Sequence, residues 1–417
     1  MGAYFLRRLL LIPPTLIGVT MLVFLITRFV PGGPMERMIA EMRKGGDGAS
    51  RGGAAQSQAL SEDQLEQLKI RFRMDQHPVA GYFSWLGVWP YADLRKKIEF
   101  GPDEKDQLIR APGTREPLKI VRSAPGSFSL TNPDGSPPDG WQWRPLPPRP
   151  NTKDIERVEI FRKRFSGLLT GNLGESFRFN EPVTDVIAQR LPVSLYYGLV
   201  TLLLTYLVSI PLGLFKALHH RSPADNVSSI LIFAGFAIPG YALGSILVTF
   251  AAARFGWFPA GGFTSFDFME KSLWGKTIDI LYHSALPLLC YLIGAFAFTT
   301  MLTKNQLMDN LAADYVRTAV AKGVPFRRAV IHHAFRNASI PVVSNLGRSL
   351  SAFVGGSFVI ERIFDINGVG LLGFESILDR DYPVVMGIVV ISSLLVMLGN
   401  ILGDFLVALV DPRIRFD

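Results

Sequence analysis

The sequence contains almost no cysteine and little charge for its length. Cys290 is the single cysteine among 417 residues, so no disulfide can form within the chain. It lies in an apolar stretch, where a lone cysteine acts as a small core residue, and we assign it no function. Only 19% of the residues are charged and 48% are hydrophobic, a balance that excludes a disordered or fibrous chain.

The charge that is present is concentrated in one stretch, and this decides the class of protein. Residues 31–190 hold 45 of the 78 Lys, Arg, Asp and Glu residues. Elsewhere, several windows of about 20 residues are almost uncharged, which is long enough to cross a bilayer as a helix. The net charge of +8 does not indicate nucleic acid, because residues 31–190 hold 24 basic and 21 acidic residues and the remaining excess flanks the apolar windows.

Six windows are apolar enough to be transmembrane helices. The first is longer than the apolar core of a signal peptide and lacks a small-residue cleavage site, so we expect an uncleaved anchor. The sequence therefore predicts an all-α polytopic membrane protein: residues 1–30 form the N-terminus and first helix, 31–190 a large external α+β insertion, and 191–417 a five-helix core. The six windows are Leu9–Val30, Leu191–Leu214, Ile230–Ala253, Leu281–Leu302, Ile340–Ile360 and Val384–Val410.

Lysine and arginine in the short loops predict the orientation, since these residues are retained in the cytoplasm. With the N-terminus inside, the short cytoplasmic segments hold twelve of them and the short external loops hold five. We therefore expect both termini in the cytoplasm and the insertion on the periplasmic side.

The insertion itself has recognisable elements. Gly45–Gly53 is glycine-rich and predicts a loop, and Ser61 opens a capping box for a helix that runs to Arg73. Leu118–Ser123 and Ser127–Thr131 alternate as a short hairpin. Asp154–Leu169 has apolar residues at helical spacing and predicts an amphipathic helix. Such an insertion either receives a partner at the external mouth or is a passive elaboration, and both readings stay open.

Motifs for chemistry are few. Gly368, Gly370 and Gly373 match GxGxxG, but no βαβ unit surrounds them, so turn formation before the last span is the expected role. None of the six histidines forms an HExxH pair, and we predict no metal site. No catalytic residues are expected, and the chain is not expected to be an enzyme.

Two ionisable residues lie within the predicted spans, where an unpaired charge is costly. Arg348 lies in the fifth window and Asp404 in the sixth. Both are candidate intramembrane polar sites. For Asp404 the favoured reading is a structural pairing with a nearby base or backbone, and for Arg348 the structural and functional readings stand equal.

The polar segment 303–339 is the most informative part of the core. Asp314–Gly323 reads as a short helix ended by glycine, Val324-Pro325 forces a turn, and a second helix follows through Arg328–Arg336. The small residues Ala319 and Ala321 would let this elbow enter a groove on a soluble partner. A merely solvated loop is the alternative.

Arg317–Gly323 resembles the EAA-type coupling motif of ABC importer permeases, in the form Arg-Thr-Ala-x-Ala-Lys-Gly of the dipeptide/oligopeptide (binding-protein-dependent) family. Arg317 and Thr318 replace the Glu and Ala of the general motif, as is characteristic of the peptide branch. Within the family the sequence is most similar to the Yej-type B subunit, and residues 91–165 depart from the family pattern. Other matching stretches are Tyr4–Leu9, Val30–Pro34, Gly171–Ser176, Arg190–Ser194, Phe364–Gly370, Arg380–Val384 and Asp411–Arg415.

The resemblance implies a type I permease that moves peptides or peptide-like compounds across the bacterial inner membrane. It implies a second permease subunit in a heterodimer, two ATPase subunits or one fused ATPase, and an external solute-binding protein. No cofactor is expected in this chain, because ATP and Mg²⁺ would bind the ATPase partners. The implied ATPase-coupling residues are Asp314, Tyr315, Arg317, Thr318, Ala319, Ala321, Lys322 and Gly323.

Two alternatives remain at this stage. The same machinery could carry nickel chelates, glutathione, sugars or another small solute. A membrane enzyme or sensor, whose external part does the work, would instead need no ATPase and would tolerate changes in the 314–336 elbow.

Overall fold

The structure, a computed structural model, describes residues 2–29, 75–112, 116–124, 126–147, 155–354 and 357–410. The predicted loop Gly45–Gly53 and the predicted helix from Ser61 to Arg73 lie outside these residues. The chain divides into two compact units. The helical unit comprises Met1–Thr27 and Glu175–Asp417, and the β unit comprises Arg28–Gly174.

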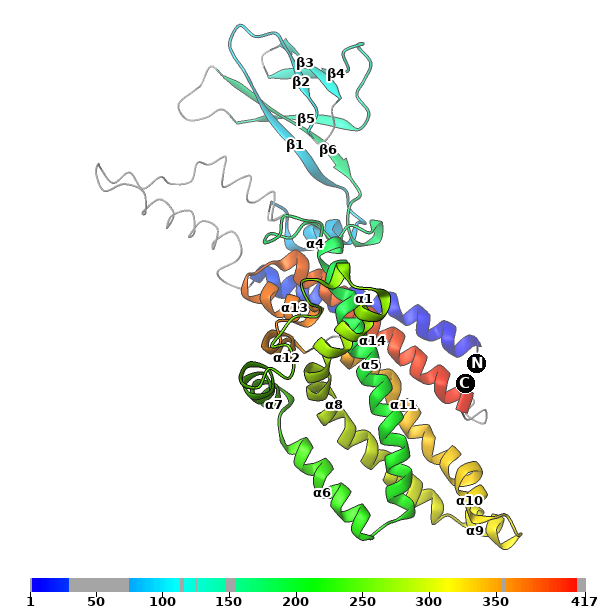
Figure 1. Ribbon diagram of the computed structural model, residues 1–417. Coiled ribbons are helices and arrows are strands. Elements are labelled where there is room, and N and C mark those ends of the chain that lie inside the picture. Colours follow the sequence, from blue (N-terminus) through cyan, green and yellow to red (C-terminus); the bar gives the residue numbers. More distant parts are fainter. Residues whose placement is uncertain are drawn as a thin grey trace. The chain divides into compact units, whose positions relative to one another are not determined.

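The helical unit is built on long apolar helices (Figure 1). Among the described residues, four helices are long and apolar enough to cross a membrane. Each contains an apolar stretch long enough to cross a bilayer, and such a stretch in lipid must be helical to satisfy its own backbone hydrogen bonds. They are α1 (Gly2–Phe29), α5 (Val183–Leu218), α8 (Leu273–Leu311) and α14 (Tyr382–Val410).

The predicted third span is broken. It consists of α6 (Pro223–Ala237) and α7 (Gly240–Leu247), and α7 continues as the π-helical turn η2 (Val248–Arg254). The two halves meet at an angle of 85°. Pro239 lies at the break; it has no N–H to donate and disfavours helical geometry at the residue before it. The span predicted over Ile230–Ala253 is therefore not one straight helix, and the pair counts as a crossing only if its two halves form one broken span.

The fifth predicted span is not reproduced as one apolar helix. Ile340–Ile360 coincides with α11 (Arg336–Val354) and the start of α12 (Phe358–Ile363). Polar residues such as Ser344, Asn345 and Arg348 lower the apolarity of α11, which is not among the described helices that qualify as crossing. Within the described residues, the helices that could cross a membrane therefore number four, or five if the bent pair is one span, whereas the sequence predicted six.

Short helices connect the long ones. α5 packs along α8 and α11, and α11 packs along α14 (Figure 1). Cys290 is buried in an apolar cluster with Tyr197 and Phe364, which confirms its role as a core residue. The connecting helices are α9 (Asp314–Ala321), α10 (Phe326–Ala329), the π-helical turn η4 (Val330–Phe335) and α13 (Val369–Leu378).

Within its described residues, the β unit holds the α-helix α4 (Pro78–Leu86) and two antiparallel three-stranded sheets in the orders β1-β6-β5 and β2-β3-β4. Phe100, Ile120 and Ile160 are fully buried in an apolar cluster to which both sheets contribute. The strands are β1 (Tyr91–Phe100), β2 (Asp106–Arg110), β3 (Pro117–Ala124), β4 (Ser127–Thr131), β5 (Trp141–Leu146) and β6 (Glu156–Arg164).

One local prediction in this unit is confirmed and one is wrong. The hairpin is present, with Ile120 on β3 opposite Leu130 on β4. The amphipathic helix predicted over Asp154–Leu169 is instead the central strand β6, paired with β1 and β5. Val158 and Ile160, two residues apart, both enter the core, because strand pairing on two sides outweighs an apolar spacing that also fits a helix.

Candidate functional site

The predicted elbow is present at one end of the helical unit, which we call the α9 end. Helix α9 stops at Ala321, and Gly323 adopts φ +90°. The Val324 N–H donates to the carbonyl of Ala319 at 3.2 Å, which satisfies the end of the helix. Pro325 then caps α10. The helix–glycine–helix prediction is therefore confirmed, although the second helix starts at Phe326 and contains a π-helical turn.

A single buried side chain anchors α9 to the bundle. Val316 is buried in a cluster with Leu307 of α8, Ala217 of α5 and Ala338 of α11. On the same elbow Tyr315 and Phe326 are 41% and 57% exposed. An elbow that is fixed by its inner face and exposes aromatic side chains among polar ones is suited to docking against another protein.

The remaining predicted coupling residues lie on or beside the outer face. Thr318 Oγ1 bonds the carbonyl of Asp314 at 2.8 Å, and Tyr315 Oη donates to Asn310 at 2.6 Å. Arg317 lies 3.9 Å from Asp314, and both side chains are exposed. The structure thus brings the predicted set together on one exposed element. Ala321, Lys322 and Gly323 are also exposed.

A basic cavity of about 740 Å³ lies behind the elbow. Ala319 and Lys322 line it from the α9 side, and His332, His333 and Arg336 line it from η4 and α11. The small side chain of Ala319 therefore borders open space, so a larger residue there would change the surface that α9 presents.

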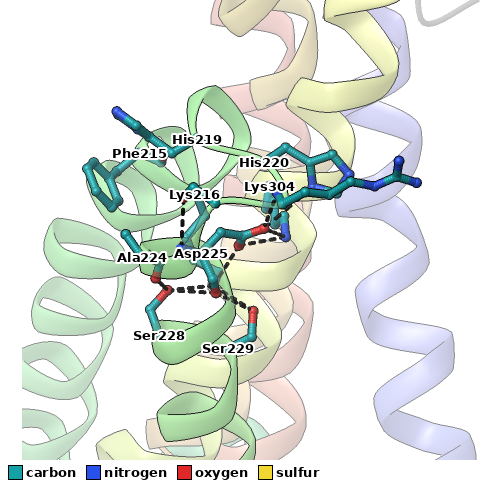
Figure 2. A network of polar contacts seen from close by, with 11 residues as sticks. Phe215, Lys216, His219, His220, Ala224, Asp225, Ser228, Ser229 and Lys304 are labelled. Atoms are coloured by element: carbon teal, nitrogen blue, oxygen red, sulfur yellow. Dashed lines mark hydrogen bonds and ion pairs between the residues drawn. The ribbon is translucent and has the colours of Figure 1, made fainter.

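A buried polar network lies near the same end, where α5, α6 and α8 meet (Figure 2). Lys304 Nζ donates to both carboxylate oxygens of Asp225 at 2.8 Å, and Lys216 Nζ lies 3.0 Å from Oδ1. Sequence reasoning counted both lysines only as loop charges and missed Asp225. The available signal was Ser222-Pro-Ala-Asp225, a helix start in which Ser222 accepts from the Asp225 N–H at 3.2 Å.

At the other end of the helical unit, two of the family-like stretches meet although they are distant in sequence. The carboxylate of Asp381 accepts from Ser176 Oγ at 2.5 Å and from the N–H groups of Phe177 and Arg178 at 3.1 and 3.2 Å. Asp381 is almost fully buried. This carboxylate therefore fixes the segment before α5 to the start of α14.

The GxGxxG glycines are explained by a second buried carboxylate at that end. Glu361 accepts from the Leu371 N–H at 2.5 Å, at the N-terminus of α13. A Cβ on Gly368 would lie 2.5 Å from the Glu361 carboxyl group, and one on Gly370 3.1 Å. The expected turn is therefore wrong: the glycines open a helix whose first N–H groups donate to the Glu361 carboxyl group.

We expect Glu361→Gln to remove part of the pH dependence of stability. Burial raises the pKa of Glu361 from 4.5 to about 7, against the hydrogen bonds from the Leu371 and Gly370 N–H groups and Ser194 that lower it. Between these pH values the unfolded state ionises and the folded state does not, so wild-type stability falls as pH rises. The difference in unfolding free energy, Glu361→Gln minus wild type, should therefore increase by about 3 kcal/mol between pH 4.5 and pH 7.5.

Thermal unfolding of both proteins in detergent across that range measures the difference. Exposed Glu270→Gln serves as the matched control and should follow the wild-type curve. Parallel curves for wild type and Glu361→Gln would show that burial does not keep this carboxyl protonated.

The two intramembrane candidates have different outcomes. Asp404 on α14 forms an ion pair with Arg8 of α1 and accepts from Tyr4 Oη at 3.1 Å. Arg8 is therefore the base that pairs with Asp404, in line with the structural role favoured from the sequence. Arg348 lies on α11, and its side chain lies outside the described structure.

Several helices that are long and apolar enough to cross a membrane indicate an integral membrane protein with an exposed elbow at one end. The family model described as "Binding-protein-dependent transport system inner membrane component" matches residues 209–416. The peptidoglycan transport system permease protein YejB of Agrobacterium fabrum is 33% identical over 420 residues, covering 100% of this chain and 99% of that protein. The inner membrane ABC transporter permease protein YejB of Escherichia coli is 32% identical, covering 100% of both.

The chain therefore belongs to the family of ABC transporter permeases of binding-protein-dependent systems, and it is a multi-pass inner-membrane protein. The oligopeptide transport system permease protein AppB of Bacillus subtilis is 37% identical but covers 61% of this chain and 80% of its own length.

Proposed function

We propose that this chain is a transmembrane subunit of an ATP-driven importer that moves peptides or peptide-bearing compounds across the inner membrane. The exposed first half of the elbow, Asp314–Gly323, carries the proposal, because a permease that is driven by a separate ATPase needs a surface through which that partner can move it. The names of the relatives supply the cargo class, oligopeptides in one case and peptidoglycan in another.

The proposed assembly has four kinds of component. A second permease subunit forms the translocation path with this chain, and two ATPase subunits, or one fused ATPase, bind ATP and Mg²⁺. A solute-binding protein delivers the cargo on the periplasmic side. In this arrangement both termini and the α9 end lie in the cytoplasm, as the distribution of Lys and Arg favours.

When the ATPase subunits bind ATP and close, they would displace α9. Since Val316 lies in one buried cluster with Leu307 and Ala217, the displacement would reach the ends of α8 and α5. It would bias the permease pair between inward-open and outward-open arrangements, an equilibrium that ATP and cargo would both shift.

Purification of the tagged chain in mild detergent from its native host tests the assembly. Mass spectrometry should recover a second permease and an ATPase with it. Labelled oligopeptides and labelled peptidoglycan fragments, supplied to cells with and without the chain, then test the cargo. A chain that retains full function in cells lacking any associated ATPase would point to the enzyme or sensor alternative.

A further inference from the structure

The carboxylate of Asp225 joins three helices at one point (Figure 2). Asp225 lies in the first turn of α6, Lys216 in the last turn of α5, and Lys304 on α8. Besides contacting the carboxylate, Lys216 Nζ lies 2.9 Å from the backbone carbonyl of Asp225 and 2.8 Å from the hydroxyls of Ser228 and Ser229. The Lys216 ammonium therefore fixes the first two turns of α6 against the end of α5.

The network is buried, and its charges are unequal. Lys216 is 0%, Asp225 2% and Lys304 9% exposed. Two ammonium groups thus share one carboxylate, with His220 Nδ1 3.5 Å away at its exposed side. Buried ion pairs generally add little net stability over well-packed apolar residues, although losing one partner is expensive. The network therefore acts mainly to fix the positions of α5, α6 and α8 relative to one another, and adds little to the stability of the fold.

The same helix ends also hold the docking elbow. Lys304 and Leu307 are neighbours on α8, and Lys216 and Ala217 are adjacent on α5. Leu307 and Ala217 belong to the cluster that buries Val316 of α9. On each helix, one residue shares the buried cluster of Val316 and a nearby residue contacts Asp225. A displacement of α9 that moves these helix ends must therefore also move the start of α6.

We propose that Asp225, held by Lys304 and Lys216, transmits displacement of α9 to α6 and so to the broken α6–α7 span. Asp225 is a positioning residue in this scheme: it contacts neither cargo nor nucleotide, and it sets how much transport follows each ATP hydrolysed. The inference rests on the proposed function, since it concerns the efficiency of an ATP-driven importer.

The test uses the complete transporter, purified with its partners and reconstituted in liposomes. ATP hydrolysis and uptake of a labelled oligopeptide are measured in the same vesicles. Asp225→Asn removes the charge that both lysines share and keeps the size of the side chain. We expect ATP hydrolysis to stay close to wild type and peptide uptake per ATP to fall by about five-fold or more.

Three further variants separate transmission from folding. Lys304→Gln leaves the Lys216–Asp225 pair in place and should show the same loss in milder form. Lys304→Arg keeps the charge and should retain coupling. Exposed Asp185→Asn, the matched control at the first turn of α5, should behave as wild type.

Exchange of the charges gives a stricter test. The double variant Asp225→Lys with Lys304→Asp restores one carboxylate between two ammonium groups, and its uptake per ATP should exceed that of either single variant.

The outcomes are distinguishable. Wild-type uptake per ATP in Asp225→Asn would overturn the inference. So would a parallel loss of hydrolysis and uptake in both Asp225→Asn and Lys304→Gln, because the network would then serve assembly alone. Absence of ATP-driven uptake in the wild-type complex would contradict the proposed function itself.

Discussion

Gly323→Pro should lower peptide uptake by about ten-fold or more while the protein still inserts in the membrane. Gly323 has φ +90°, in the left-handed region, whereas proline is fixed near −65°. The chain could not leave α9 and enter α10 along the observed path, so the outer face of the elbow would be lost. Uptake of a labelled oligopeptide by cells, normalised to the amount of the chain in the membrane fraction, measures the effect.

The elbow offers matched controls. Gly323→Asn should retain most uptake, because asparagine tolerates the left-handed region and a Cβ at this position has no atom within 4 Å. Ala319→Glu should reduce uptake as Gly323→Pro does, since it places a negative charge at the edge of the basic cavity without altering the backbone. Normal uptake in both Gly323→Pro and Ala319→Glu would rule out docking through α9.

Gly347→Val should destabilise the helical unit by about 3 kcal/mol. The glycine lies where α11 crosses α14, and a Cβ on it would collide with the carbonyl of Gly399 and lie 2.8 Å from the Cα of Gly403. Both neighbours are backbone atoms, so the helices would have to separate, as expected where small residues permit close approach. Thermal unfolding in detergent, followed by size-exclusion chromatography, reports the loss.

The control for this prediction is the same substitution at a glycine of another helix. Gly294 lies on α8, and a Cβ there meets nothing within 4 Å. Gly294→Val should therefore unfold near the wild-type temperature. Equal midpoints for the two variants would show that the α11–α14 crossing can widen at no cost.

Sequence patterns predicted the features that depend on local chemistry. Uninterrupted apolar runs identified α5, α8 and α14, and the glycine and proline at 323 and 325 identified the elbow. Alternating residues identified the β3–β4 hairpin. In each case the signal and the structure involve residues near one another in the chain.

The features that the sequence did not predict depend on distant partners. The strand β6 is paired on both sides by segments that no local pattern reveals, so its helical spacing was misleading. Ser176 and Asp381 are 205 residues apart, and Asp225 and Lys304 are 79 residues apart. A charged residue beside an apolar window looks like a loop charge until the fold shows that its partner is buried with it.

Cross-linking from position 319 tests the central claim, that a separate ATPase drives this chain through α9. Cys290 is buried, so Ala319→Cys supplies the one accessible thiol in the chain. Membranes from the native host are treated with a short thiol-reactive cross-linker, and the products are identified by mass spectrometry. The account predicts a product with an ATPase subunit that is absent when the thiol is placed instead at exposed Asp185. Transport-competent membranes that yield no ATPase product from position 319 would contradict it.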